Sequence, residues 1–275
     1  MKKLSFIFET RNMYSSPVNE HDFLLRCVPQ ERPEQRIVEM HLDVQPLVTG
    51  GNFGVDSFGN RTYTGRLPRG HTTFSYRVQG IAIRDESRRL PCPHPLPVYS
   101  YPSTLTRPSE TLRRLFESVE ASDDDLEQAE RFRVAVYEFM TYKSGVTNVQ
   151  TTAADAALFR AGVCQDFTHI FLALCRMKHI PARYVSGIPV GEGASHAWAE
   201  IWYDGKWHGI DATRNCPADE KYLKFCSGRD FIDCPIEQGV FWGCCTQSQE
   251  VYTKLEEITD ASCPSNDQRD SKNNQ

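Results

Sequence analysis

The sequence has no run of lysine and arginine interleaved with aromatic residues, and its formal net charge is −5. Domains that bind nucleic acid usually carry a basic patch, so we expect no nucleic-acid partner. No apolar run is long enough to cross a bilayer, and the apolar segment near the first residue is too short for a signal peptide or an anchor. We therefore predict a cytoplasmic protein without membrane association.

Common metal and phosphate signatures are also missing. There is no Cys-x-x-Cys pair, and no zinc-protease, EF-hand or P-loop pattern. The ten cysteines would suggest a disulfide framework in a secreted protein, but without a secretory signal we expect reduced thiols. The cysteines between Cys216 and Cys245 lack zinc-knuckle spacing, so we predict no metal and no cofactor, with a structural zinc as the alternative.

The composition is that of an ordinary globular protein, with 40% hydrophobic and 24% charged residues. Residues 1–85 repeat an alternation of apolar and polar positions, as at Leu4, Phe6 and Phe8, which is typical of β-strands. Turn-rich pieces such as Asp56–Asn60 separate the alternating segments. We predict an N-terminal antiparallel β-sandwich over residues 1–85, with at most a packing or substrate-docking role.

The rest of the chain divides by composition. Six prolines between Arg84 and Pro108 force extended backbone, so residues 86–108 are predicted to be a proline-rich linker. Helical periodicity followed by strand-like segments predicts a second folded domain over residues 109–261. Residues 262–275 are polar and are predicted to be a disordered tail. The predicted fold class is α+β.

A cysteine stands at the start of a helical pattern between Ala161 and Pro181. Gly162 supplies a permissive turn, and from Cys164 onward apolar residues recur at helical spacing, which predicts a helix with one buried face. The positive end of the helix dipole favours a thiolate in the first turn, as a nucleophile requires. The alternative is that Cys164 only packs as a small apolar residue.

The turn Asp204-Gly205 predicts a two-residue β-hairpin. That register places Trp202 opposite Trp207. By continuation it makes His196 and Asp211 diagonal neighbours on one face, about 7–8 Å apart at Cα and within reach of a hydrogen bond. A three-residue loop would put them on opposite faces.

Together, Cys164, His196 and Asp211 supply what attack on an amide requires: a nucleophile, a base, and a group that orients the base. Each residue alone has an ordinary structural explanation, but the combination predicts a catalytic triad. The backbone N–H of Cys164 is a natural oxyanion donor, whereas the sequence does not identify a second donor.

Supporting roles can be predicted for other charged residues. Asp166 is expected to stabilise or cap the start of the cysteine helix. Arg183 and Arg229 are expected to be buried partners of Glu200 or Asp230.

These motifs resemble those of the bacterial transglutaminase-like superfamily. The likeness extends to the predicted N-terminal β-domain, and Ala212 departs from the proline that many members have after the aspartate. The segments that carry it are Tyr142–Thr147, Gly162–Phe167, Ile180–Gly187, His196–Glu200, Asp211–Thr213 and Gly228–Phe231.

The resemblance implies a papain-like core, with Cys164, His196 and Asp211 as the triad acting on a peptide or protein substrate through a thioester. We predict a cysteine peptidase or amidase. Transfer of the acyl group to an amine, as in a true transglutaminase, is one alternative. A non-catalytic peptide-binding module is the other.

Overall fold

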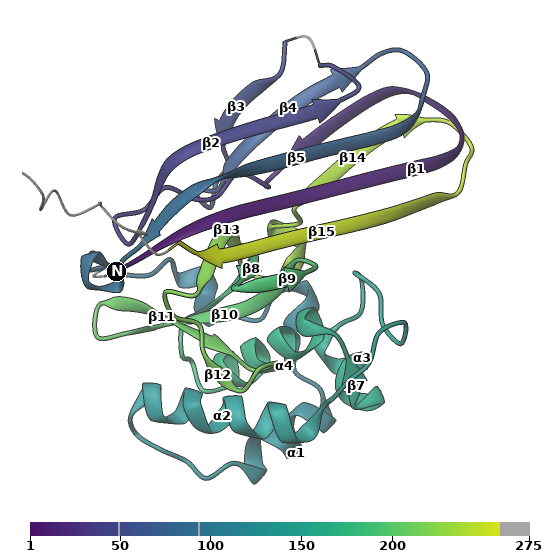
Figure 1. Cartoon of the computed structure of the whole chain (residues 1–275). Helices are drawn as coiled ribbons and strands as arrows, with labels where there is room; N and C mark the ends of the chain where they lie inside the picture. Colours follow the sequence, from purple (N-terminus) through teal and green to yellow (C-terminus); the bar gives the residue numbers. More distant parts are fainter. Residues whose placement is uncertain (49, 93, 259–275) are drawn as a thin grey trace, which may run out of the picture.

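A computed structural model of the chain describes residues 1–48, 50–92 and 94–258. A large antiparallel sheet lies against a region built of a second, smaller sheet and several helices (Figure 1). The predicted α+β fold class is confirmed. The predicted disordered tail, residues 262–275, lies outside the described residues. No helix in the described ranges is both long and apolar enough to cross a membrane.

The large sheet is organised around β1 (Lys2–Leu25), which pairs with four other strands. Its first half lies between β5 and β15, and its second half pairs with β4 and β14 (Figure 1). Alternate side chains of β1 are buried, which is the pattern expected of a strand with one face on a core. The other strands of the sheet are β2 (Gln35–Gln45), β3 (Asn52–Val55), β4 (Arg61–Leu67), β5 (His71–Arg84), β9 (Gly191–Gly193), β14 (Glu237–Trp242) and β15 (Gln247–Glu257).

Strands β14 and β15 come from the range predicted for the second domain, residues 109–261, but they complete the N-terminal sheet. The reason is that β1 is long enough to need a partner on each side along both of its halves. The domain bounds themselves remain a prediction from the sequence.

The second sheet has the strand order β12-β11-β10-β8-β13, and it carries the cysteine helix α4 (Cys164–Met177) on one face. Its strands are β8 (Ala182–Pro189), β10 (His196–Tyr203), β11 (Lys206–Asp211), β12 (Cys216–Pro217) and β13 (Tyr222–Gly228). Helices α1 (Glu110–Ser118), α2 (Asp125–Phe139) and α3 (Ala153–Phe159) pack around α4, and β6 (Thr141–Tyr142) pairs with β7 (Ala161–Gly162).

Helix α4 is buried on every side from Gln165 to Arg176, not on one face as its periodicity predicted. The sheet covers one side of the helix and the other helices cover the rest, so its polar residues must find partners inside the protein. Arg176 does so by donating to the carbonyl of Tyr99 and the hydroxyl of Ser103. Burial lowers the pKa of Arg176 to about 10.

The segment predicted as a linker, residues 86–108, is packed onto the region of the helices and the second sheet. It contains the short 3₁₀ turns Glu86–Arg88, Pro97–Ser100 and Thr104–Thr106, and Tyr99 and Leu105 are buried. Residue 93 lies outside the described residues. The contacts with Arg176 tie this segment directly to the cysteine helix.

Side-chain amides join the two parts of the molecule along β13. The amide of Gln35 donates to the carbonyl of Lys224 and accepts from its N–H, at 2.7 and 2.8 Å. The side-chain amide of Asn60 likewise donates to the carbonyl of Ser227 at 2.9 Å and accepts from its N–H at 2.8 Å. The predicted turn at Asp56 holds Asn60 in place, since the Asp56 carboxylate accepts from the Asn60 N–H at 3.0 Å. These side chains satisfy backbone groups at the edge of β13, and they fix the large sheet against the second sheet.

Candidate active site

Cys164 is the first residue of α4. Asp166 caps the helix start: its Oδ2 accepts from the Val163 N–H and the Thr147 hydroxyl, both at 2.7 Å. The predicted role of Asp166 at the helix start is therefore confirmed. A Cβ at Gly162 would lie 2.3 Å from Asp166 Oδ2, so a side chain there would displace the cap. Local hydrogen bonds and a close backbone approach thus position the thiol.

The hairpin has the predicted register. Trp202 pairs with Trp207, and the pairing continues along the two strands toward Asp211. His196 Nε2 lies 2.7 Å from Asp211 Oδ2, and the Asp211 side chain has no exposure to solvent. The N–H groups of Thr213 and Arg214 donate to the other carboxylate oxygen, Oδ1, at 2.9 and 3.0 Å. Asp211 is thereby held in one orientation with Oδ2 directed at the imidazole.

Opposing effects act on the pKa of the His196 imidazole. Burial of the ring lowers its pKa, but the hydrogen bond with Asp211 and the interactions with Cys164 outweigh burial and raise the pKa to about 9. Burial acts to raise the pKa of Asp211, but the hydrogen bond from His196 prevails and lowers it. The site therefore favours an imidazolium between a carboxylate and a thiol.

Tyr222, which the sequence analysis did not identify, completes the support of the carboxylate. Its hydroxyl donates to Asp211 Oδ2 at 2.9 Å, so the same oxygen serves both His196 and Tyr222. The Trp198 ring stacks on His196 with centroids 6.5 Å apart, and Tyr222 packs edge-on against Trp198. Tyr222 begins β13, which is separated from Asp211 in the sheet by two strands, and no local pattern indicates this contact.

Replacing Tyr222 with phenylalanine is expected to lower the free energy of unfolding by about 1.5–3 kcal/mol, because a hydrogen bond to a charged group is lost. We expect kcat to fall on the order of tenfold with little change in KM, since Tyr222 acts through its hydrogen bond to Asp211. Denaturant unfolding and steady-state kinetics measure the two effects. Unchanged values of both would contradict the assigned role.

A cavity of about 680 Å³ opens above the cysteine, within the range of small-ligand sites. Cys164 and His196 line this cavity together with Phe8, Tyr76 and Val251 of the large sheet. The N-terminal sheet is therefore part of the candidate active site.

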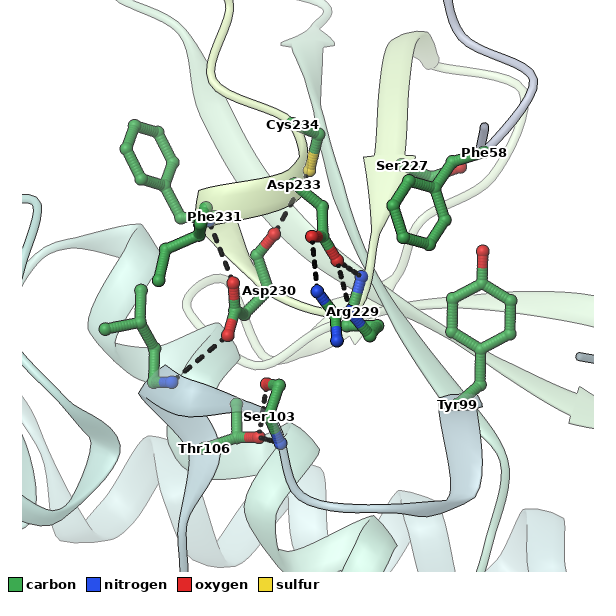
Figure 2. Close-up of polar contacts among 12 residues, drawn as sticks. Phe58, Tyr99, Ser103, Thr106, Ser227, Arg229, Asp230, Phe231, Asp233 and Cys234 are labelled. Atoms are coloured by element: carbon green, nitrogen blue, oxygen red, sulfur yellow. Dashed lines mark hydrogen bonds and ion pairs between the residues drawn. The ribbon is translucent and has the colours of Figure 1, made fainter. Parts of the chain in front are cut away.

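The loop Arg229–Cys234 forms another wall of this cavity through Phe231 and Ile232. Figure 2 shows how it is held: the Asp230 carboxylate accepts from the N–H of Leu105 at 3.1 Å, and the Arg229 guanidinium donates two hydrogen bonds to the Asp233 carboxylate. The loop is thereby fastened to the 86–108 segment.

The predicted buried ion pair is present for Arg183 but not for Arg229. Arg183 bonds Glu200 at 2.6 Å, as predicted. Arg229 pairs with Asp233 rather than Asp230, because Asp230 is used to cap the 3₁₀ turn Phe231–Asp233. The Arg229 side chain is also only half-buried.

Within the described ranges, no group of three or more His, Cys, Asp or Glu side chains could hold a metal ion. The cysteines there are free thiols, and Cys263 lies outside those ranges.

Comparison with known proteins identifies two family regions. Residues 4–82 match the model of the bacterial transglutaminase-like N-terminal region, and residues 113–212 match that of the transglutaminase-like superfamily. An uncharacterized protein of Mycobacterium tuberculosis is 33% identical over 123 residues, and one of Mycobacterium leprae is 38% identical over 114 residues. These matches cover 39% and 38% of this chain, and the chain spans only 39% and 40% of the relatives' lengths.

A solved structure has a similar fold over almost the whole chain. It is the crystal structure of a "Putative Cysteine Protease" from Cytophaga hutchinsonii, with 23% identity and a TM-score of 0.79. The match covers 96% of this chain and 93% of that one.

Proposed function

Because this chain belongs to the transglutaminase-like superfamily, we propose that it is a cysteine enzyme that hydrolyses amide bonds in a peptide or protein substrate. The observation that carries the proposal is the joint placement of Cys164 and His196 in one cavity, with His196 Nε2 2.7 Å from the buried carboxylate of Asp211. Because Nε2 is engaged by Asp211, Nδ1 is the nitrogen left to exchange a proton with the thiol.

In the proposed reaction, Cys164 gives its proton to His196 and its sulfur attacks the amide carbon. The backbone N–H of Cys164 at the start of α4 stabilises the oxyanion. His196 then protonates the departing nitrogen, the C–N bond breaks, and a thioester remains on Cys164. Water, deprotonated by His196, attacks this thioester, releases the acid and restores the thiol.

The acceptor distinguishes two enzyme classes. Attack by water on the thioester gives a peptidase or amidase, whereas attack by a primary amine gives a transglutaminase. We propose water as the acceptor, with transfer to an amine as the alternative. The cytoplasmic location stays a prediction.

The proposal is tested by incubating the protein with a mixed peptide library and a primary amine, followed by mass spectrometry, with Cys164→Ala as the control. New peptide termini or deamidated glutamines that depend on Cys164 are the expected products. Amine-modified glutamines would establish acyl transfer instead. Peptide binding without any Cys164-dependent product would overturn the proposal and favour a binding module.

A further inference from the structure

Glu237, the first residue of β14, is the only carboxylate among the described residues that line the active-site cavity. The other ionisable groups in the described lining are the catalytic Cys164 and His196 and several tyrosines, and no described lysine or arginine lines it. Transfer of a proton from Cys164 to His196 gives a thiolate and an imidazolium, so the pair carries no net charge. The charge of the cavity is then set by Glu237.

Residues of two other strands, β1 and β15, hold this carboxylate in position. The side-chain nitrogen of Asn12, on β1, donates to both Glu237 oxygens, at 2.7 and 3.0 Å. Gln249, on β15, donates to Glu237 Oε2 at 3.4 Å and to Asn12 Oδ1 at 3.0 Å. Gln247 donates to the same Asn12 oxygen at 3.0 Å. The amide of Asn12 is thereby oriented so that its N–H groups face Glu237.

All these partners of Glu237 are neutral. Burial raises the pKa of Glu237, and the hydrogen bonds from Asn12 and Tyr76 lower it only in part. Among the described residues, no lysine or arginine forms an ion pair with it. A carboxylate kept in a partly apolar cavity with only amide and hydroxyl partners has a strong remaining affinity for a cation.

We propose that Glu237 binds a primary ammonium group of the substrate, so that the preferred amides belong to molecules that carry a free amine within reach of the cavity. The proposal rests on the proposed function, because it assigns the substrate class of the same site. Asn12 and Gln249 orient the carboxylate, and the walls provided by Phe8, Tyr76 and Val251 would contact the apolar stem of the amine-bearing group.

The experiment uses Cys164 as a reporter that needs no turnover. Aminoethyl methanethiosulfonate is cationic and methyl methanethiosulfonate is neutral. With either reagent the cysteine sulfur forms a mixed disulfide and the sulfinate leaves. The modification rates of Cys164 are measured by peptide mass spectrometry, with the exposed Cys244 in the same molecule as an internal reference. We expect the cation-to-neutral rate ratio at Cys164 to fall on the order of tenfold in Glu237→Gln.

Two controls separate a local effect from a general one. Glu192→Gln removes an equal charge from an exposed residue of β9 and should leave the ratio unchanged. Glu237→Asp keeps the charge and should retain most of the preference. A ratio at Cys164 that is unchanged in Glu237→Gln would overturn the proposal, even if the enzyme hydrolyses amides. Conversely, suppose that the ratio falls in Glu237→Gln as expected while the wild-type protein shows no Cys164-dependent turnover. That pair of results would refute the proposed function alone.

Paired peptides then distinguish the source of the amine. One pair differs by lysine against norleucine, and the other by a free against an acetylated amino terminus. For the pair that supplies the recognised group, the charged member should show a KM about tenfold lower, and Glu237→Gln should abolish that difference. Equal KM values in both pairs would contradict recognition of an ammonium group.

Discussion

Replacing Cys164 with alanine is expected to reduce amide turnover at least ~10³-fold, because Cys164 is the only thiol among the described residues that line the cavity. The fold should be retained. The helix start is held by Val163, Asp166 and Thr147, none of which is changed. The free energy of unfolding should therefore shift by no more than about 0.5 kcal/mol. Activity assays and denaturant unfolding of the purified variant provide the two measurements.

Cys244→Ala is the matched control, since Cys244 is exposed and lies outside the cavity. This variant should keep full activity and full stability. If Cys164→Ala retained more than a tenth of the wild-type activity, the nucleophile would have to be another group, and the proposed mechanism would fail.

Replacing Asp211 with asparagine is expected to lower kcat by about 10²–10⁴, although the two side chains have the same shape. The N–H groups of Thr213 and Arg214 both need an acceptor at the Oδ1 position. The amide oxygen will therefore take that position and place the NH₂ group against His196 Nε2. His196 must then accept at Nε2 and carry its proton on Nδ1, the nitrogen needed to receive the proton of the thiol.

The pH dependence should change in the same variant. His196 has a pKa of about 9 against an ordinary 6.5, so its charged form is stabilised by folding. That contribution to stability is fully present below about pH 6.5 and is lost as the pH rises through 9. If the imidazolium is the active form, the alkaline limb of kcat/KM lies near pH 9 and moves to lower pH in Asp211→Asn. An alkaline limb at the same pH in both proteins would contradict the assignment to His196.

Local patterns in the sequence were sufficient for the central part of the site. A two-residue turn fixes the register of a hairpin, and that register brings His196 and Asp211 together. Helical periodicity likewise placed Cys164 at a helix start. These features depend on contacts between residues close in sequence, or on the regular alternation of a strand.

Other parts of the site depend on contacts that no local pattern encodes. Tyr222 reaches Asp211 across two strands, and Glu237 meets Asn12 across 225 positions in the sequence. Arg229 was predicted to pair with the wrong aspartate, because residue type alone does not tell whether Asp230 or Asp233 faces the guanidinium. The large sheet thus contributes residues to the site that its alternating pattern did not distinguish from ordinary packing.

The order of strands in the large sheet has a consequence for biosynthesis. Strand β15 lies between β1 and β9, and β14 lies beside the second half of β1, so two of the four partners of β1 are translated after the rest of the described fold. Until residues 237–257 leave the ribosome, β1 keeps an unpaired edge that is open to non-native association. Glu237, Gln249 and Val251 also reach the cavity only at that stage. The cavity around Cys164 is therefore completed only after translation has passed residues 237–257.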